Sequence, residues 1–546
     1  MRTYAGGVNK SQPAPPQAAA AGVVSVAAGV VAGELAAAFV SPALSPMTGV
    51  GSAVIDAVPP AVKDWAVAVF GTADKLALLV GMGLVMAAMA GLAGLVEWRR
   101  RFAGAAVIAV FGVVGLAAVL GRAQATVNAV VLPLLAAGTG ILVLHWLMSR
   151  LRDWKKTGAE AERDAPERDV PEGSAPERGV PERPAPERPA AGRRRFLQAL
   201  GGGAVGAAAG GVLAAALRGA AAGVSEFRSR LALPSAASPA PPLPAGAELE
   251  LGGISPLVTP NRDFYRIDTA LTVPAVDPDT WVLKVTGMVE RDIELDFATL
   301  LSKPMTERHV TIACVSNEVG GNLIGNALWL GWPVRELLAM AGPQSGADMV
   351  LSRSTDGWTA GTPLEVLTDG RDALLAVGMN GEPLPLEHGF PVRLVVPGLY
   401  GYVSATKWLT ELKVTRFADD AGYWTPRGWS ERGPIKMSSR IDVPRAGRPV
   451  RAGTVAFGGV AWAQHTGIGK VELRVNRGDW QAAELAPGIS RDTWYQWQLP
   501  LALTPGQYEI QVRATDLNGA RQIEDRARVA PDGATGFHTI RVDVTP

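Results

Sequence analysis

Four long apolar runs dominate the first 150 residues, at positions 18–40, 76–96, 103–120 and 129–148. Each run is close to the ~20 residues that a helix needs to cross a bilayer. Because lipid offers no hydrogen-bond partners to the backbone, the runs are expected to be helical despite their many glycines. A single run could be a buried helix of a soluble protein, but four in succession favour a transmembrane helical bundle over residues 1–150.

A proline-rich stretch follows the fourth run. Within residues 161–189 the tripeptide Pro-Glu-Arg occurs four times, and proline at such short intervals with alternating charge cannot build a core. Residues 151–192 are therefore predicted to form an extended, solvated linker. A fifth apolar run occupies residues 193–218, and a second linker, rich in proline and alanine, is expected over 219–250.

Shorter periodic segments replace the long runs beyond residue 250. Residues 281–285 and 392–396 are strand-like, whereas 297–301 and 333–341 have helical patterns. From about residue 441 the apolar and polar positions alternate, as in 471–475, 508–513 and 539–544, with turn residues between them. Alternation of this kind is typical of an antiparallel β-sandwich. The predicted fold is thus multidomain: the helical bundle, an α+β domain over 251–440 and a β-sandwich over 441–546.

The formal net charge is only +1, so the sequence gives no general electrostatic attraction to nucleic acid. The distribution of the basic residues, in contrast, predicts a membrane topology. Basic clusters at residues 99–101 and 150–156 flank the apolar runs, and the positive-inside rule places both clusters in the cytoplasm. The chain is therefore predicted to be a multi-pass protein of the cell membrane. Its C-terminal half, beyond the fifth run, is predicted to lie on the extracytoplasmic side.

Two features of the apolar region could have additional roles. Arg193-Arg194-Arg195-Phe196-Leu197 resembles a twin-arginine export signal, although a fifth span with a basic flank would give the same topology. Glu34 interrupts the first run, and a carboxylate inside a membrane is a functional candidate by default.

Cys314 is the only cysteine in the 546 residues, so an internal disulfide is excluded. The β-branched run 310–312 places the thiol at the end of a predicted strand, and a polar, glycine-bearing turn follows it. A lone cysteine is often buried and inert. The alternative is a thiolate that acts as a nucleophile or as a soft metal ligand.

Five ordered motifs favour the metal ligand. TIACVSN (311–317), WLG (329–331), MNGEPLPLEHGFPVR (379–393), PGLYG (397–401) and ATKWL (405–409) resemble the molybdenum-cofactor domain of the sulfite oxidase family. The resemblance extends from about residue 251 to the C-terminus. It implies a molybdenum–molybdopterin cofactor, a two-electron oxygen-atom transfer, and an immunoglobulin-like C-terminal module that forms a homodimer.

The resemblance also assigns roles to individual residues. Cys314 matches the cysteine that binds molybdenum, and Arg266 matches an arginine near the metal, so both are candidate catalytic residues. The other matches are candidate contacts of the pterin or its phosphate: Asn261, Asp356, His388, Arg393, Ser404, Thr406 and Lys407. Surface salt bridging is the alternative for Arg393 and Lys407, and a turn histidine is the alternative for His388.

The chain departs from the family pattern around the substrate pocket. Asn317-Glu318-Val319 stands where sulfite oxidases have arginines, and a carboxylate would repel a dianion. Trp358 stands where a tyrosine is expected. The C-terminal module of the family usually contributes an arginine to the pocket, and His465 is a candidate to take its place. These departures put sulfite in doubt and favour a neutral substrate such as a sulfoxide.

No redox centre for electron delivery is encoded elsewhere. There is no haem-attachment motif, no second cysteine for an iron–sulfur cluster, and His145 is the only histidine in the apolar runs. The sequence therefore predicts a membrane-anchored oxidoreductase acting on a small sulfur oxyanion or sulfoxide, with a separate quinone or cytochrome as electron partner. Two alternatives are a metal-free scaffold or receptor with the same fold, and a helical transporter regulated by the soluble half.

Overall fold

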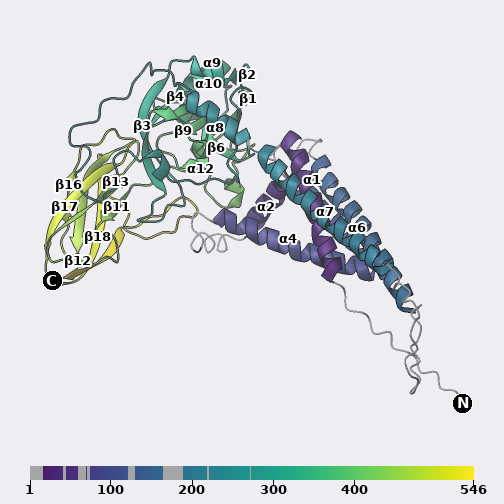
Figure 1. Ribbon diagram of the computed structural model, residues 1–546. Helices are drawn as coiled ribbons and strands as arrows, with labels where there is room; N and C mark the ends of the chain where they lie inside the picture. Colours follow the sequence, from purple (N-terminus) through teal and green to yellow (C-terminus); the bar gives the residue numbers. More distant parts are fainter. Residues whose placement is uncertain are drawn as a thin grey trace, which may run out of the picture. The chain divides into compact units, whose positions relative to one another are not determined.

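The computed structural model describes residues 16–40, 45–58, 69, 74–120, 130–163, 188–217, 220–270 and 272–546. Two compact units are distinguished, Met1–Ala220 and Ala221–Pro546. The first unit is helical, and the second contains all the described strands together with short helices (Figure 1).

The helical unit confirms that the predicted apolar runs are helices. Within the described residues five helices are long and apolar enough to cross a membrane. Their bounds are α1 (Pro16–Val40), α4 (Asp74–Arg99), α5 (Ala103–Leu120), α6 (Val131–Arg163) and α7 (Arg188–Leu217). The predicted linker is shorter than expected, because α6 continues to residue 163 and α7 already begins at Arg188. Residues 164–187, which hold most of the proline repeat, lie outside the described residues.

Glu34 has a structural partner in this unit. A short helix, α2 (Pro46–Ala57), follows α1, and the hydroxyl of Ser45 accepts a hydrogen bond from Thr48 N at its first turn. The buried carboxylate of Glu34 accepts another from Met47 N at 3.0 Å. Glu34 therefore stabilises the N-terminus of α2, where orphan N–H groups and the helix dipole favour a negative charge.

A second buried carboxylate lies at the turn between α4 and α5. Glu97 is 1% exposed and accepts hydrogen bonds from Phe102 N and Gly104 N, both at 3.0 Å. Arg152 of α6 donates to the Glu97 carbonyl at 2.7 Å, and His145 Nε2 is 3.7 Å from the carboxylate. His145 therefore belongs to the cluster that closes the α4–α5 turn.

Two sheets form the α+β domain of the second unit. The first has the order β2-β1-β10-β5-β6, and the second has the order β3-β4-β7-β8, with β9 paired to β7. Their bounds are β1 (Val282–Gly287), β2 (Ile293–Asp296), β3 (Thr306–Ala313), β4 (Ile324–Pro333), β5 (Met349–Ser354), β6 (Thr359–Pro363), β7 (Leu374–Met379), β8 (Glu382–Pro383), β9 (Arg393–Val395) and β10 (Leu409–Thr415).

Short helices connect and cover these sheets. They are α8 (Ala220–Arg230), η4 (Asn261–Asp263), α9 (Phe297–Leu301), α10 (Val334–Ala341), α11 (Leu364–Thr368), η5 (Leu386–His388), α12 (Gly401–Ser404) and η6 (Thr425–Arg427). The predicted second linker is thus partly helical. Val224 of α8 is buried in an apolar cluster with Phe264 and Trp329, and Arg228 donates to the Leu384 carbonyl at 2.7 Å. The start of the second unit is therefore fastened to the β7–β8 hairpin.

The C-terminal strands form two further sheets, ordered β11-β13-β17-β16 and β12-β19-β18-β14-β15. Their inner faces share one apolar core, which contains Phe457 and Trp497 from one sheet and Val471, Ile510 and Ile540 from the other. The predicted β-sandwich is confirmed in this respect. The bounds are β11 (Ser438–Val443), β12 (Val450–Arg451), β13 (Gly453–Trp462), β14 (Ile468–Val475), β15 (Gln481–Ala482), β16 (Glu484–Leu485), β17 (Tyr495–Leu503), β18 (Gly506–Asp516) and β19 (His538–Thr545). Strand β11 begins three residues before the predicted boundary at 441.

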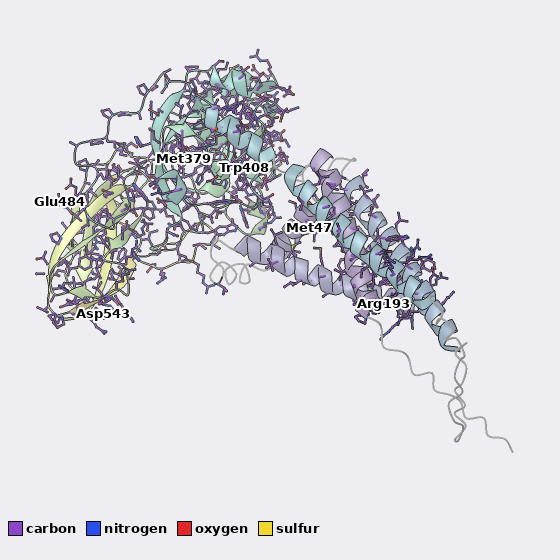
Figure 2. All side chains as sticks on the ribbon, viewed as in Figure 1. Met47, Arg193, Met379, Trp408, Glu484 and Asp543 are labelled. Atoms are coloured by element: carbon purple, nitrogen blue, oxygen red, sulfur yellow. The ribbon has the colours of Figure 1, made fainter. Side chains whose placement is uncertain are left out.

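The outer edge of β3 is covered rather than exposed. At its start, the chain at Ser238 forms a parallel bridge with Thr306. Near its end, Thr311 N donates to the Asp492 carbonyl at 2.9 Å, and Trp494 N donates to the Thr311 hydroxyl at 2.9 Å. A loop of the β-sandwich therefore occupies hydrogen-bonding positions that the α+β domain leaves open. The packed side chains of both parts are drawn in Figure 2.

Candidate functional site

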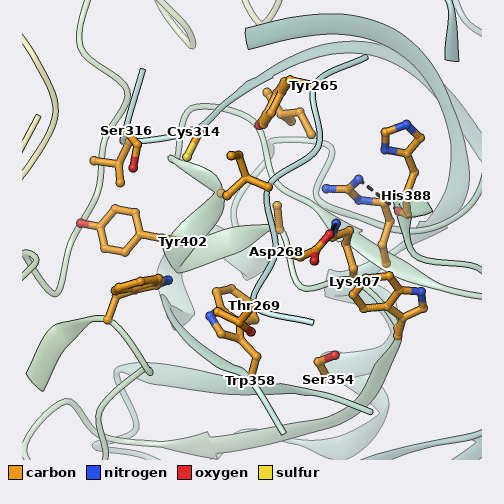
Figure 3. Close-up of a pocket in the computed structure, with 18 of the residues that line it drawn as sticks. Tyr265, Asp268, Thr269, Cys314, Ser316, Ser354, Trp358, His388, Tyr402 and Lys407 are labelled. Atoms are coloured by element: carbon orange, nitrogen blue, oxygen red, sulfur yellow. Dashed lines mark hydrogen bonds and ion pairs between the residues drawn. The ribbon is translucent and has the colours of Figure 1, made fainter. Parts of the chain in front are cut away.

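A cavity of about 150 Å³, partly open to solvent, lies within the α+β domain. Segments far apart in the chain line it: the stretch after η4, the end of β3, the β5–β6 turn, η5, α12 and the loop after β10. The residues that carry chemistry or ring faces in the lining are Phe264, Tyr265, Asp268, Thr269, Cys314, Ser316, Asp356, Trp358, His388, Arg393, Tyr402, Lys407, Trp408, Trp424 and Trp429 (Figure 3).

Cys314 lies in the first position after β3. Its N–H donates to the Leu323 carbonyl at 2.9 Å, and its own carbonyl accepts from Asn317 N at 3.1 Å, so the following turn is tightly closed. The thiol is 8% exposed. Burial raises the pKa of Cys314, against an opposing effect of hydrogen bonding from Ser316. The thiol is therefore neutral in the protein alone, and a bound metal ion would favour its thiolate form.

A group of basic side chains lies in another part of the lining. His388 Nε2 is 3.1 Å from the Asn261 carbonyl, and burial, assisted by Arg393 and Lys407, lowers the pKa of His388 to about 4. Arg393 Nη1 donates to the His388 carbonyl at 3.1 Å, and its guanidinium lies 5.0 Å from the ring of Trp329. Burial lowers the pKa of Arg393 to about 10. At neutral pH the group therefore contains a charged guanidinium beside an uncharged imidazole.

Lys407 and Arg266 share one carboxylate. Asp268 Oδ2 lies 2.6 Å from Lys407 Nζ and 3.0 Å from Arg266 Nε. Asp268 is 5% exposed and Lys407 is 9% exposed, whereas Arg266 is 37% exposed. Burial lowers the pKa of Lys407 to about 8, although Asp268 acts in the opposite direction. The cation of Lys407 is thus retained near neutral pH largely by its ion pair.

Aromatic rings form much of the remaining wall. The rings of Tyr402 and Trp429 have centroids 5.9 Å apart, and those of Trp424 and Trp429 are 6.3 Å apart. Tyr265 is deeply buried, which raises its pKa, so its hydroxyl remains protonated. Figure 3 shows Trp358 and Thr269 together, across the cavity from Cys314 and Tyr265. The wall is therefore mainly apolar, with a small number of fixed polar groups.

The structure brings together five of the nine residues singled out from the sequence. They are Cys314, Asp356, His388, Arg393 and Lys407, all of which line the cavity. Their assigned roles remain predictions, but their convergence does not depend on the family resemblance.

The other four lie outside the lining. Asn261 donates to the Met379 carbonyl and to Glu382, so its side chain is engaged by the β7–β8 hairpin. The hydroxyl of Ser404 donates to the carbonyls of Leu399 and Tyr400, and that of Thr406 lies 2.6 Å from Ser352 Oγ. Arg266 faces Asp268. The polar groups of these four side chains are therefore hydrogen-bonded or ion-paired to neighbouring residues.

One expectation about the substrate pocket is not met. His465 lies outside the lining: it is 47% exposed and its Nδ1 is 3.1 Å from Asp492 Oδ1. Trp358 lines the cavity, and two tyrosines from other positions, Tyr265 and Tyr402, line it as well. Sequence analysis missed two lining residues, Tyr265 and Asp268. Tyr265 directly precedes Arg266 and Asp268 follows it by two positions, so both lie in a segment that the sequence had already indicated.

No metal site is complete by itself among the residues that the structure describes, since no group of three or more His, Cys, Asp or Glu side chains converges there. A single cysteine would therefore need further ligands from a cofactor. The dithiolene of a molybdopterin supplies such ligands, and Arg393, Lys407 and neutral His388 are suitable partners for a phosphate and a polar ring system.

Comparisons with known proteins agree with this chemistry. The family model described as "Oxidoreductase molybdopterin binding domain" matches residues 270–424. Human mitochondrial sulfite oxidase is 30% identical over 336 residues, which cover 52% of this chain and 59% of the human protein. The uncharacterized oxidoreductase YuiH of Bacillus subtilis is 35% identical over 165 residues, covering 30% of this chain and 80% of YuiH.

One solved structure similar to the chain is the sulfane dehydrogenase SoxCD from Paracoccus pantotrophus, with a TM-score of 0.46, 23% identity, and coverage of 53% of this chain and 81% of that one. The chain spans about six tenths of the length of the mammalian sulfite oxidases that it matches. Together with the cavity around Cys314, the family model and the similarity to YuiH show that the chain belongs to the sulfite oxidase family of molybdenum-dependent, molybdopterin-binding oxidoreductases.

Proposed function

We propose that this protein is a membrane-anchored oxidoreductase that transfers an oxygen atom to or from a small sulfur compound, either a sulfur oxyanion or a sulfoxide. The observation that carries the proposal is the position of the lone thiol, Cys314, in the same cavity as Arg393, Lys407 and uncharged His388. One end of this cavity offers a soft metal ligand, and another offers cationic and hydrogen-bonding groups.

The residues present fit the family's cofactor. Cys314 would bind the molybdenum, and Arg393, His388 and Lys407 would hold the phosphate and the pterin. When bound, the cofactor supplies the two-electron oxygen-atom transfer. The contribution of the chain is to orient the reactants and to exclude water, which strengthens electrostatic interactions inside the cavity.

The charges of the lining favour a substrate without strong negative charge. Asp268 neutralises Lys407, and Arg266 is turned toward the same carboxylate. Arg393 lies at the end assigned to the cofactor, and the aromatic wall offers no compensating cation. A neutral sulfoxide therefore suits the cavity better than a sulfite dianion, although both belong to the proposed substrate class.

The helical unit would anchor this activity to the cell membrane. Five apolar helices of sufficient length and the basic clusters at 99–101 and 150–156 support a multi-pass topology with the catalytic domain on the extracytoplasmic side. The β-sandwich would be the immunoglobulin-like dimerisation module of the family. Electrons would come from or pass to a separate quinone or cytochrome.

The proposal is tested by the Cys314→Ser variant of the full chain, expressed in a host that makes molybdopterin. We expect the wild-type protein to contain molybdenum and to show sulfur-to-metal charge-transfer absorption. With a redox dye, we expect it to turn over sulfite or methyl sulfoxides. The variant should lose the absorption band and at least a hundredfold in turnover while its circular dichroism spectrum remains that of the wild type.

Two results would overturn the proposal. One is a Cys314→Ser protein whose activity and absorption equal those of the wild type. The other is a wild-type protein that contains no molybdenum after expression in the competent host, which would support the metal-free scaffold instead.

A further inference from the structure

The loop that connects β3 to β4, residues 314–323, begins at Cys314 and is called the Cys314 loop here. Val315 and Ile324 are buried, but every residue between them is partly or fully exposed. At its base, Cys314 N donates to the Leu323 carbonyl at 2.9 Å. A surface loop with few apolar anchors is among the least stable parts of a fold. The conformation of this loop therefore depends on the hydrogen bonds that it receives from elsewhere.

An arginine of the β-sandwich donates one of these hydrogen bonds. Arg440 lies on β11, at the edge of its sheet, and its Nη1 donates to the Gly321 carbonyl of the Cys314 loop at 2.7 Å. Its Nη2 donates to the Ser255 hydroxyl at 2.8 Å, and its Nε donates to Asp442 Oδ1 at 2.6 Å. Asp442 Oδ2 in turn accepts from Ser255 N at 3.0 Å. Arg440 and Asp442 are each 9% exposed, so one buried ion pair joins the loop to the β-sandwich.

The neighbouring glycine of the loop also meets the β-sandwich. A Cβ at Gly320 would lie 2.4 Å from the ring of His538, which leaves no room for a side chain there. The ring is fixed in turn, because His538 Nδ1 accepts from Ile441 N, the residue after Arg440, at 2.9 Å. Two consecutive loop residues are therefore held against strands β11 and β19.

Arg440 does not have the position of an anion-binding residue. It lies outside the lining of the cavity around Cys314, and all three of its nitrogens donate to partners within the protein. It therefore differs from the pocket arginine that the family resemblance implies for the C-terminal module. A buried ion pair adds little net stability compared with apolar side chains of similar size. What a guanidinium offers is a rigid planar fork that fixes several acceptors at once.

We propose that Arg440, held by Asp442, is a positioning residue for the metal ligand: it keeps the Cys314 loop in the closed form that directs the thiol into the cavity. This inference rests on the proposed role of Cys314. It assigns the β-sandwich a part in the metal site, in addition to any role in dimerisation. Because the contacts lie within the protein, the thiol is already in place before the cofactor binds.

The reactivity of the thiol tests the proposal directly. Cys314 is the only cysteine, so alkylation by iodoacetamide, followed by mass spectrometry, reports this side chain alone. The full chain is purified in detergent from a host that makes no molybdopterin. The wild-type thiol is 8% exposed and should react slowly. Arg440→Gln should react at least tenfold faster because the loop opens more often. Arg440→Lys keeps the charge but loses the fork, and its rate should lie between the two.

A matched control separates this effect from general loosening of the β-sandwich. Arg513 belongs to the same domain, is 15% exposed and pairs with Glu472 at 2.8 Å, far from Cys314 in the sequence and without a hydrogen bond to its loop. Arg513→Gln should leave the alkylation rate close to that of the wild type. An unchanged rate in Arg440→Gln, or an equal rise in Arg513→Gln, would overturn the inference. If Arg440→Gln does not fold, the same comparison between Arg440→Lys and Arg513→Lys decides.

The molybdenum content connects the loop to the metal site. After expression in a host that makes molybdopterin, Arg440→Gln should contain several times less molybdenum than the wild type and Arg513→Gln. Rapid alkylation without the cofactor combined with a full molybdenum content would also overturn the inference. A wild-type protein without molybdenum whose alkylation rate still depended on Arg440 would refute the proposed function but not the control of the thiol by Arg440. Equal alkylation rates in an active, molybdenum-containing protein would refute only the positioning role.

Discussion

The ammonium group of Lys407 lies 2.6 Å from the carboxylate of Asp268, and both side chains are at least nine-tenths buried. Asp268 also binds Arg266 through the same oxygen. A single carboxylate therefore reduces the positive field of two residues that the family resemblance assigns to anion binding. Whether the cavity favours an anionic or a neutral ligand therefore depends on Asp268 as much as on Lys407 and Arg266.

Replacing Asp268 by asparagine should shift the preference toward anions. We expect the ratio of kcat/KM for sulfite to that for a neutral methyl sulfoxide to rise about tenfold, or about 1.4 kcal/mol. The increase should fall with ionic strength because screening weakens the released charges. Since Asp268 raises the pKa of Lys407, its loss lowers that pKa below about 8, and the increase should be larger at pH 6 than at pH 8.

The control for this prediction is Asp263→Asn, which changes the net charge equally but lies outside the lining. An unchanged ratio in Asp268→Asn at low ionic strength would show that Lys407 and Arg266 do not act on the substrate.

The turn after Cys314 should be sensitive to a single methyl group. Gly320 has a φ of +81°, and a Cβ there would lie 2.4 Å from the ring of His538. Gly346 has a similar φ of +87° with nothing within 4 Å of its would-be Cβ. Gly346→Ala should cost only the backbone strain, about 1–2 kcal/mol. Gly320→Ala should lower stability further and reduce the molybdenum content, measured by thermal unfolding and metal analysis. Equal losses in both variants would exclude the contact with His538 as the cause.

His538 should make stability depend on pH. Its Nδ1 accepts a hydrogen bond from Ile441 N at 2.9 Å, which requires an unprotonated nitrogen. Burial and nearby Arg440 lower its pKa to about 4 from the ordinary 6.5. The unfolded chain therefore takes up a proton between these pH values that the folded chain does not bind, so stability falls as pH falls from 6.5 toward 4.

Urea unfolding between pH 7.5 and 4.5 measures this effect. Because His538 is partly exposed, its share is on the order of 1 kcal/mol. His538→Gln should have a shallower pH dependence than the wild type, whereas His465→Gln, at an exposed histidine, should follow the wild type. Parallel curves for His538→Gln and the wild type would contradict the assignment.

Glu97 should hold the turn between α4 and α5 together. Glu97→Ala leaves the N–H groups of Phe102 and Gly104 without their acceptor. Loss of a buried, charge-assisted helix cap should lower the stability of the helical unit by about 2–4 kcal/mol. Glu97→Gln keeps one acceptor oxygen and should lose less. Thermal unfolding in detergent measures both variants, and identical melting curves for all three proteins would refute the prediction.

Local sequence signals predicted much of the fold. The helix predicted at 297–301 has the same bounds in the structure, because Asp296 caps it by accepting from Thr299 N at 2.7 Å. The strand that ends just before Cys314 is also confirmed. In contrast, α8 was predicted to be part of a linker. Its stability comes from contacts with residues more than a hundred positions away, such as the Leu384 carbonyl, which no local pattern contains.

The site was less predictable than the fold. Motif matches identified Cys314, His388, Arg393 and Lys407, but they did not reveal that Asp268 neutralises Lys407 across 139 positions in the sequence. The tryptophans at 424 and 429 follow β10 and reach the cavity only through the tertiary fold. For Ser404 and Thr406 the motif match did not reveal the local partners of their hydroxyl groups, which are the Tyr400 carbonyl and the Ser352 hydroxyl.

The covered edge of β3 has a consequence for how the protein can be divided. A fragment truncated near residue 440 would lack Asp492 and Trp494, and the backbone of Thr311 would present an unpaired strand edge only three residues from Cys314. Bare edges of this kind recruit other chains. The α+β domain is therefore not expected to remain monomeric without the β-sandwich. By covering the edge of β3, the β-sandwich prevents that edge from pairing with other chains, whatever role it has in assembly.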